Sequence, residues 1–203
     1  RVQSSLSEEE LIFPPYNALQ IQDILRQRCE QAFAPGVVEP GVVEKCAAYA
    51  AREHGDARRA IDLLRVAGEL AERENSKTVA LNHLDKAEEK IESDKIVNTV
   101  TSQPKQFQLV LYAILQLTPN KRPFFTGEIY ELYSQVCKKA QFNVLTQRRI
   151  SDILAEFDML GIINAKIISK GRYGRTREVS VSLDEMMKIK LQELIEKSLK
   201  MNN

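Results

Sequence analysis

Residues 162–182 read IINAKIISKGRYGRTREVSVS, and this stretch decides the fold of the second half of the chain. Two β-prone runs, Ile162–Ser169 and Glu178–Ser182, flank a loop, Lys170–Arg177, in which glycines stand among basic residues. In the second run valines alternate with serines, as in a strand with one buried face. The stretch therefore predicts a two-stranded antiparallel hairpin with a basic tip.

Three amphipathic helices are expected before this hairpin. The first contains the apolar run FQLVLYAIL at 107–115. Thr126 and Thr146 are the expected N-caps of the second and third helices, and Gly161 is expected to end the third. Three helices followed by a two-stranded hairpin is the order of elements in a winged helix. We therefore expect a winged helix that binds double-stranded DNA over Thr99–Ser182.

Positive charge is concentrated in this part of the chain. The whole chain has 29 basic and 28 acidic residues and a net charge of +1. Residues 138–177 alone contain nine basic and three acidic residues, so this segment carries +6 and the remainder −5. Basic side chains gain affinity for DNA by releasing the counterions of its phosphates. The charge distribution therefore predicts a DNA-binding face on a nearly neutral protein.

The candidate DNA contacts lie at the start of the third helix and in the hairpin. Glutamine and arginine can make paired hydrogen bonds with adenine and guanine edges, so we expect some direct reading of sequence by the helix. The hairpin tip is expected to enter a minor groove or to lie along the backbone. The predicted DNA-binding residues are Thr146, Gln147, Arg148, Arg149, Ser151, Lys170, Arg172, Tyr173, Arg175 and Arg177. The alternative is a basic surface that binds protein.

The first half of the chain is expected to be a small bundle of helices. Apolar stripes with helical spacing follow Asn17, Pro40 and Asp56, and a fourth helix is expected to begin at Ser76 or Thr78. The connections between these stripes are short. This block therefore contributes only helices to the fold.

The sequence HGDARRA at 54–60 lies between two of these helices. A short turn there brings Arg58 to the start of a helix, where its fixed charge can meet the γ-phosphate of a nucleotide. Arg59 competes for this role, because the phase of the helix decides which side chain faces the nucleotide. Taken alone, the pattern favours a pair of surface arginines on an amphipathic helix.

The order of short motifs along the chain resembles that of archaeal origin-recognition initiators of the AAA+ class. These motifs are RVQSSL at 1–6, IFPPY at 12–16, DIL at 23–25 and HGDARR at 54–59, followed by the winged helix. HGDARR itself resembles the sensor-2 motif in the lid of AAA+ ATPases. The family is related to the eukaryotic origin-recognition and replication-licensing ATPases.

The resemblance implies a mainly α protein with two folded parts. A helical AAA+ lid bundle is expected at 14–98, and a winged-helix domain with a two-stranded hairpin wing at 99–203. Residues 1–13 are expected to be a remnant of the AAA+ nucleotide-binding core. The sequence TSQP at 101–104 is the candidate boundary between the two parts.

The function that the resemblance implies is that of a replication initiator fragment that binds duplex origin DNA. The parent protein would be an ATP-switched origin-binding and helicase-loading factor that holds ATP or ADP with Mg²⁺. The sensor-2 role would fall to Arg58 or Arg59. The sequence contains no Gly-rich phosphate loop with its Lys-Ser/Thr and no acidic metal-binding motif on a strand. We therefore expect no catalytic residue, no cofactor and no enzyme activity in this chain.

Double-stranded origin DNA is the expected partner, and the resemblance adds other initiator subunits and the replicative helicase. The alternative function is a protein-interaction module that docks other replication proteins, with DNA contact incidental. No apolar stretch is long enough for a membrane span, and we expect a cytoplasmic, nucleoid-associated protein. The three cysteines are scattered and His54 and His83 are isolated, so neither a metal site nor a disulfide framework is expected.

Two further groups of apolar residues are assigned to packing. Tyr112, Tyr130 and Tyr133 follow helical spacing and are expected in the core, not on a stacking surface. A last helix, capped by Asp184, is expected to pack back on the winged helix, with partner binding as the alternative.

Overall fold

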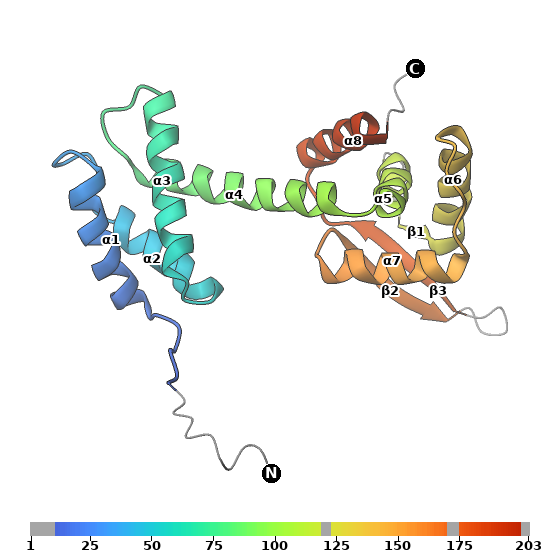
Figure 1. Ribbon diagram of the computed structural model, residues 1–203, viewed down its shortest axis with the longest axis horizontal. Helices are drawn as coiled ribbons and strands as arrows, with labels where there is room; N and C mark the ends of the chain where they lie inside the picture. The colour runs from blue at the N-terminus through green and yellow to red at the C-terminus, as the bar shows by residue number, and fades with distance from the viewer. Residues whose placement is uncertain (1–10, 119–122, 170–174, 200–203) are drawn as a thin grey trace, which may run out of the picture. The chain divides into compact units, whose positions relative to one another are not determined.

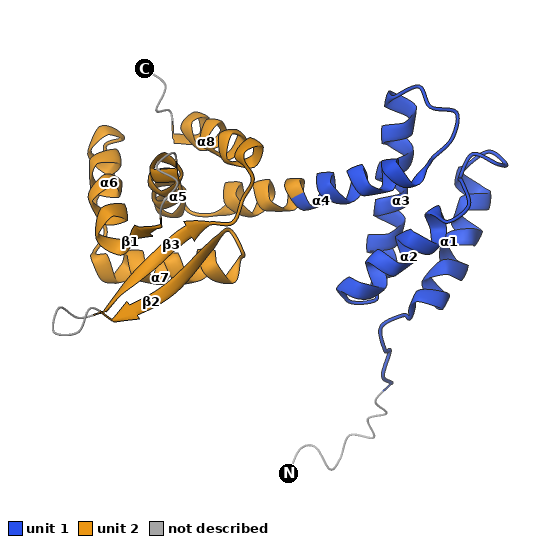
Figure 2. Cartoon of the chain, turned by 180° about the vertical axis from the view of Figure 1, so that it is seen from behind, with its two compact units in different colours: residues 1–92 blue, residues 93–203 orange. Residues whose placement is uncertain are grey.

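The chain divides into two compact units, residues 1–92 and 93–203 (Figure 1; Figure 2). The computed structural model describes residues 11–118, 123–169 and 175–199. The division falls within helix α4 (Leu81–Ser102), and each unit has its own apolar core. The predicted fold class, mainly α with a small antiparallel sheet, is confirmed.

The first unit is a helical bundle made of α1 (Ala18–Ala32), α2 (Val42–Glu53), α3 (Ala57–Arg73) and the first part of α4. Two of the predicted helix starts are confirmed by side-chain caps. The side chains of Asn17 and Asp56 accept hydrogen bonds from the backbone N–H of Gln20 and Arg58. One face of each helix enters the core, whose fully buried members include Ile21, Leu25, Val42, Cys46, Leu63, Ala67 and Leu84.

The predicted start of the fourth helix at Ser76 or Thr78 is wrong. Helix α4 begins at Leu81, because the residues before it take part in another interaction. Val79 pairs with Val38 in an isolated parallel bridge. A residue paired in this way keeps an extended backbone and cannot enter a helix.

The second unit contains the last part of α4, α5 (Lys105–Leu117), β1 (Phe124–Phe125), α6 (Thr126–Lys139), α7 (Gln147–Met159), β2 (Ile163–Ser169), β3 (Arg175–Val181) and α8 (Glu185–Leu199). The sheet has the order β1-β3-β2, and both pairings are antiparallel. Strands β2 and β3 pair from Ile163 and Val181 to Ser169 and Arg175. This register confirms the predicted hairpin but not its bounds. The predicted loop included Arg175, Thr176 and Arg177, whereas β3 begins at Arg175 and these residues pair with Ser169, Ile168 and Ile167 of β2.

Strand β1 is a departure from the sequence prediction, which placed only two strands in this unit. Phe124 pairs with Val179 of β3 and is buried in the core. Thr126 is the first residue of α6 and not its N-cap, so that part of the prediction is wrong. Its hydroxyl oxygen instead accepts a hydrogen bond from the backbone N–H of Arg177 at 3.3 Å. Thr126 thus joins the start of α6 to the hairpin.

The core of the second unit joins α5, α6, α7 and α8 to one face of the sheet. Tyr112 and Tyr133 are buried in this core and Tyr130 packs against it, as predicted. Helix α8 contributes a buried stripe, so its predicted packing on the winged helix is confirmed. This stripe consists of Met187, Leu191, Ile195 and Leu199. The predicted cap is also present, since Asp184 Oδ1 accepts a bond from the N–H of Met187 at 2.7 Å.

A buried glutamine, Gln108 on α5, connects three elements of the second unit. Its side-chain amide donates to backbone carbonyls at the end of α4, including those of Thr101 at 3.2 Å and Gln103 at 3.1 Å. Its Oε1 accepts a bond from the Ser198 hydroxyl of α8 at 2.8 Å. The last carbonyls of a helix have no partner within the helix. Gln108 therefore provides hydrogen-bond partners for carbonyls at the end of α4 and for a hydroxyl of α8.

Replacing Gln108 by leucine should lower the free energy of unfolding by about 1–2 kcal/mol, because carbonyls and a hydroxyl lose their buried partner. The measurement is urea unfolding followed by circular dichroism. Gln135→Leu on the exposed face of α6 is the matched control, and we expect it to change stability by less than about 0.5 kcal/mol. Equal effects of the two substitutions would contradict this role.

Candidate nucleic-acid interface

The first turn of α7 is fixed by hydrogen bonds within the second unit. The Thr146 hydroxyl accepts a bond from the N–H of Arg149 at 3.4 Å, which confirms Thr146 as the N-cap. Leu145 lies just before α7, and its N–H donates to the hydroxyl of Tyr133 on α6 at 3.1 Å. The same hydroxyl donates to Gln106 Oε1 on α5 at 2.5 Å. Burial raises the pKa of Tyr133, so this hydroxyl keeps its proton at neutral pH. The start of α7 is therefore held in position by the fold itself.

The two arginines in this turn have different surroundings. The Arg149 guanidinium lies 5.8 Å from the ring centre of Phe107, and its Nη1 is 4.0 Å from Glu156 Oε1. An arginine over an aromatic ring gains a cation–π attraction. Arg148 forms no ion pair with any residue that the structure describes, and it faces a hollow beside the hairpin. Arg148 is thus the more available of the two charges.

One face of the hairpin changes character along its length. Near the start of β2 it carries Ile163 and, across the sheet, Val179, and both are buried in the core. Alternate residues of a strand share a face, so the same face carries Ile167, Arg177 and Arg175 toward the tip. A surface that packs inward at one end is therefore basic at the other.

The starts of α6 and α7 and the hairpin together border a hollow of about 460 Å³. Its described lining consists of Thr126, Gly127, Gln147, Arg148, Ser151, Ile167, Arg175, Thr176 and Arg177. None of these residues is acidic, and three of them are arginines. The structure thus brings predicted residues of the helix and of the hairpin to one concave surface (Figure 1 shows α7 beside β2 and β3).

The remaining predicted contacts do not line this hollow. Thr146 is the N-cap of α7, and Arg149 lies in the first turn of that helix. Lys170, Arg172 and Tyr173 lie outside the described residues.

Four lining residues, Thr126, Gly127, Ile167 and Thr176, were not among the predicted contacts. Thr126 was expected only as a helix cap. Ile167 could have been found from the sequence, because side chains alternate along a strand and this alternation places Ile167 on the same face as Ile163. The sequence did not show that this face leaves the core before Ile167.

The second candidate site lies at the start of α3 in the first unit. Arg59 is held by three carboxylates: its Nε is 3.1 Å from Glu53 Oε2, and its Nη2 is 3.2 Å from Glu88 Oε2 and 2.8 Å from Glu92 Oε1. Its side chain is only 16% exposed. The neighbouring Arg58 is exposed, and its guanidinium makes no ion pair with the described residues.

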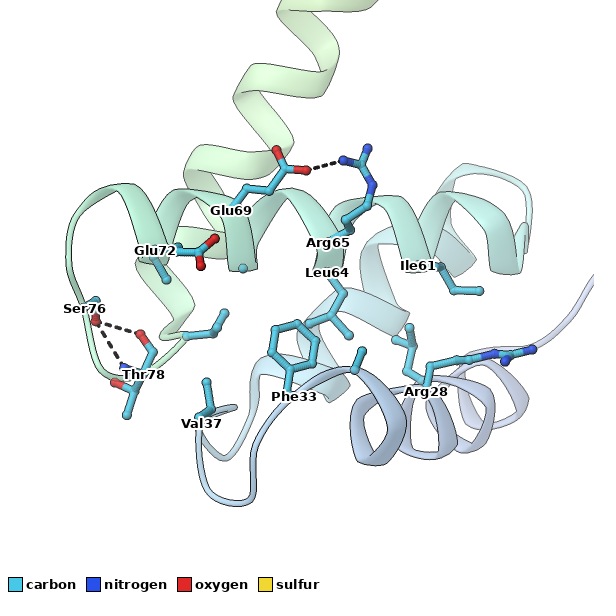
Figure 3. A pocket seen from close by; sticks show the side chains of 15 residues that line it. Arg28, Phe33, Val37, Ile61, Leu64, Arg65, Glu69, Glu72, Ser76 and Thr78 are labelled. Atoms are coloured by element: carbon cyan, nitrogen blue, oxygen red, sulfur yellow. Dashed lines mark hydrogen bonds and ion pairs between the residues drawn. The ribbon is translucent and has the colours of Figure 1, made fainter.

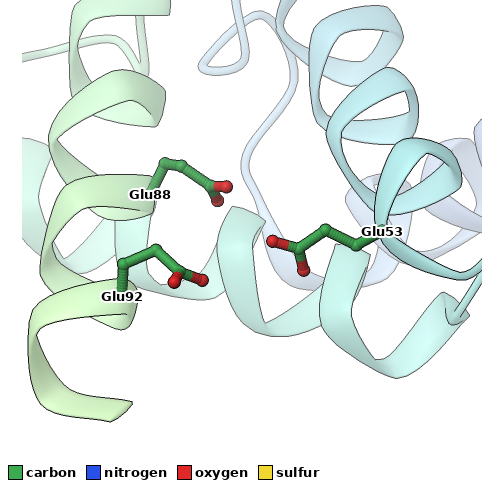
Figure 4. A group of neighbouring side chains, drawn as sticks. All are labelled: Glu53, Glu88 and Glu92. Atoms are coloured by element: carbon green, nitrogen blue, oxygen red, sulfur yellow. The ribbon is translucent and has the colours of Figure 1, made fainter. Parts of the chain in front are cut away.

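The three glutamates converge from α2 and α4 (Figure 4). Such a group of carboxylates can hold a metal ion, but here the Arg59 guanidinium already supplies the opposite charge. Burial raises the pKa of Glu88, and the charge of Arg59 opposes that increase. The positive charge of Arg59 therefore explains why three carboxylates lie close together.

An apolar groove of about 540 Å³ lies in the first unit between α1, α3 and the segment before α4 (Figure 3). Phe33, Ile61 and Leu64 line it, and Arg65 at its rim pairs with Glu69. Every buried side-chain nitrogen and oxygen in the described part of the chain has a hydrogen-bond partner. The groove therefore offers no orphan polar group that would identify a ligand.

One histidine and one cysteine, His83 and Cys46, are buried in the first unit. The buried His83 accepts a bond at Nδ1 from the N–H of Ala80 at 3.0 Å. Burial raises the pKa of the Cys46 thiol to about 12, and its Sγ donates to the Ala60 carbonyl. A thiol with such a pKa is a poor nucleophile and a poor metal ligand at neutral pH.

Among the described helices, none has the length and apolar character needed to cross a membrane.

Two family models match the chain in the order of its two units. The model described as the Cdc6 AAA+ ATPase-type lid domain matches residues 22–89. The model described as the CDC6 C-terminal winged helix domain matches residues 98–190.

Curated archaeal proteins and one solved structure are similar to nearly the whole chain. The chain is 56% identical over 184 residues to the ORC1-type DNA replication protein of Pyrococcus horikoshii, covering 90% of this chain and 44% of the relative. It is 50% identical over 203 residues to ORC1-type DNA replication protein 1 of Archaeoglobus fulgidus, covering 100% of this chain and 49% of the relative. The structure of the Aeropyrum pernix ORC1 protein in complex with DNA is 49% identical with a TM-score of 0.79, covering 97% of this chain and 51% of that one. The chain spans about half the length of these relatives.

Proposed function

The chain belongs to the archaeal ORC1/Cdc6 family of DNA replication initiators, and we propose that it binds double-stranded origin DNA through its winged helix. The resemblance predicted from the ordered sequence motifs is thereby confirmed. The observation that supports the proposal best is the hollow between α7 and the hairpin. It is lined by arginines from both elements and by no acidic residue of the described chain. The similar Aeropyrum pernix structure is a complex with DNA.

The division of the chain follows from the same proposal. We assign residues 14–98 to the lid, residues 99–203 to the winged helix, and residues 1–13 to the end of the AAA+ core. The two matching family models, at 22–89 and 98–190, support this assignment. The whole protein would then be an origin-binding, helicase-loading factor switched by ATP and ADP with Mg²⁺. Its further partners would be other initiator subunits and the replicative helicase.

Arg58 is our candidate for the sensor-2 residue of that nucleotide site. The sequence left Arg58 and Arg59 as alternatives, and the surroundings of the two side chains favour Arg58. Arg59 is engaged by three glutamates, whereas Arg58 is exposed at the start of α3. An exposed guanidinium can reach a phosphate bound on another domain.

Binding to a mixed-sequence 30-bp duplex, measured by fluorescence anisotropy between 50 and 200 mM salt, tests DNA binding. We expect the logarithm of the affinity to fall linearly with the logarithm of salt, with a slope of about −3 to −5 for roughly four or five phosphate contacts. Selection from a random duplex library should then enrich a preferred sequence. Binding that is absent, or that does not depend on salt, would contradict the proposal. In that case the alternative, a protein-docking module, would be favoured.

A further inference from the structure

We propose that the hollow between α7 and the hairpin holds one sugar–phosphate unit of the DNA backbone. In this arrangement Ile167 packs against the deoxyribose, and the three arginines of the hollow surround the phosphate. The inference rests on the proposed function, since it assigns one part of the DNA to one part of the interface. It makes Ile167 a binding residue and assigns the hollow to positioning the DNA, not to reading bases.

The exposure of Ile167 is the first observation behind this inference. Its side chain is 65% exposed, although it lies on the hairpin face that buries Ile163. It is directly opposite Arg177 in the sheet. Among the described residues that line the hollow, it is the only large apolar side chain. A lone apolar side chain among arginines and hydroxyls calls for a ligand that is itself partly apolar.

The chemistry of the lining is the second observation. Three guanidinium groups and the hydroxyls of Thr126 and Ser151 provide many hydrogen-bond donors around one concave volume. A phosphate group is an acceptor throughout, and arginine matches it in shape and charge. A base edge, in contrast, presents donors and acceptors side by side in one plane. The donor-rich lining therefore fits a phosphate better than a base.

The combination of both features distinguishes a backbone unit from a free anion. An inorganic phosphate would engage the arginines and leave Ile167 in water. A deoxyribose attached to the phosphate offers carbon atoms for contact with the isoleucine, and removal of apolar surface from water is favourable. Contacts to phosphate and sugar fix the position of a protein on DNA without specifying sequence. A loss of the Ile167 contact should therefore weaken binding equally for all sequences.

The test is Ile167→Ser, measured by anisotropy on two 30-bp duplexes of unrelated sequence at several salt concentrations. We expect about fivefold weaker binding to both duplexes, the scale for losing ~40 Å² of apolar contact. The salt slope should stay unchanged, because the substitution changes no charge. Ile189→Ser is the matched control, since Ile189 is a 59% exposed isoleucine on α8 outside the hollow. We expect it to change affinity by less than about twofold.

Three further results complete the design. Ile167→Val should retain affinity within about twofold, because it keeps most of the apolar contact. Unchanged binding by Ile167→Ser would overturn the inference, and so would a loss seen on only one duplex, which would place Ile167 against a base. Inorganic phosphate should compete with DNA for the hollow, and its inhibition constant should be the same for the wild type and for Ile167→Ser, since phosphate makes no contact with the isoleucine. Absence of DNA binding by the wild type would instead contradict the proposed function.

Discussion

Replacing Arg148 and Arg175 together by glutamate should weaken binding to a mixed-sequence duplex by about a thousandfold at 0.1 M salt. Each arginine is expected to neutralise about one phosphate, and each glutamate adds repulsion where attraction was lost. Both residues line the hollow, one from α7 and one from β3, so the substitution acts on both halves of the interface. Anisotropy titrations should also show a salt slope that is smaller in magnitude by about 2.

A control must distinguish the effect of where the charges are changed from the effect of the change in net charge. Lys95→Glu with Lys197→Glu produces the same change in net charge from exposed positions on α4 and α8, away from the lining of the hollow. We expect this variant to bind within about threefold of the wild type, because exposed charges beyond a Debye length are largely screened. Equal weakening by the two variants would mean that only the net charge matters. Intact binding by Arg148→Glu with Arg175→Glu would place the interface elsewhere.

The sequence predicted this interface as a region more reliably than as a set of residues. The charge of residues 138–177 and the order of helices and hairpin were enough to expect a basic face on a winged helix. The difference between Arg148 and Arg149 was not available, because adjacent helical residues point about 100° apart and either one could face outward. The ring of Phe107, more than 40 positions earlier in the chain, engages Arg149. Such a long-range contact leaves no local signal.

The same limit explains the missed strand β1. Two residues, Phe124 and Phe125, form it only because β3 lies alongside, and its partner Val179 is 55 positions later. Helices α5 and α7 could be predicted because their apolar period is local and runs over several turns. A two-residue strand has no period of its own. Thr126 was misread for a related reason, since its hydroxyl serves the hairpin and not its own helix.

Replacing Arg59 by methionine should lower the free energy of unfolding of the first unit by about 2–3 kcal/mol at pH 7. The substitution leaves Glu53, Glu88 and Glu92 facing one another with no positive charge between them, and an unpaired, partly buried charge is strongly destabilising. The expected loss of stability is smaller than for a fully buried ion pair, because Glu53 and Glu92 are about 40% exposed. Arg58→Met is the matched control, and its exposed side chain should contribute less than about 0.5 kcal/mol.

The pH dependence of this difference identifies its electrostatic origin. Burial raises the pKa of Glu88, and the substitution removes Arg59, the charge that opposes this increase most strongly. A carboxyl whose pKa is higher in the folded than in the unfolded state binds more protons when folded, so its contribution to stability is lost as the pH rises. The deficit of Arg59→Met should therefore be small near pH 4 and reach its full size by pH 7. Urea unfolding at both pH values measures the deficit, and hydrogen exchange assigns it to α2, α3 and the start of α4. A deficit of equal size at pH 4 and pH 7 would show that Arg59 contributes by packing and not by its charge.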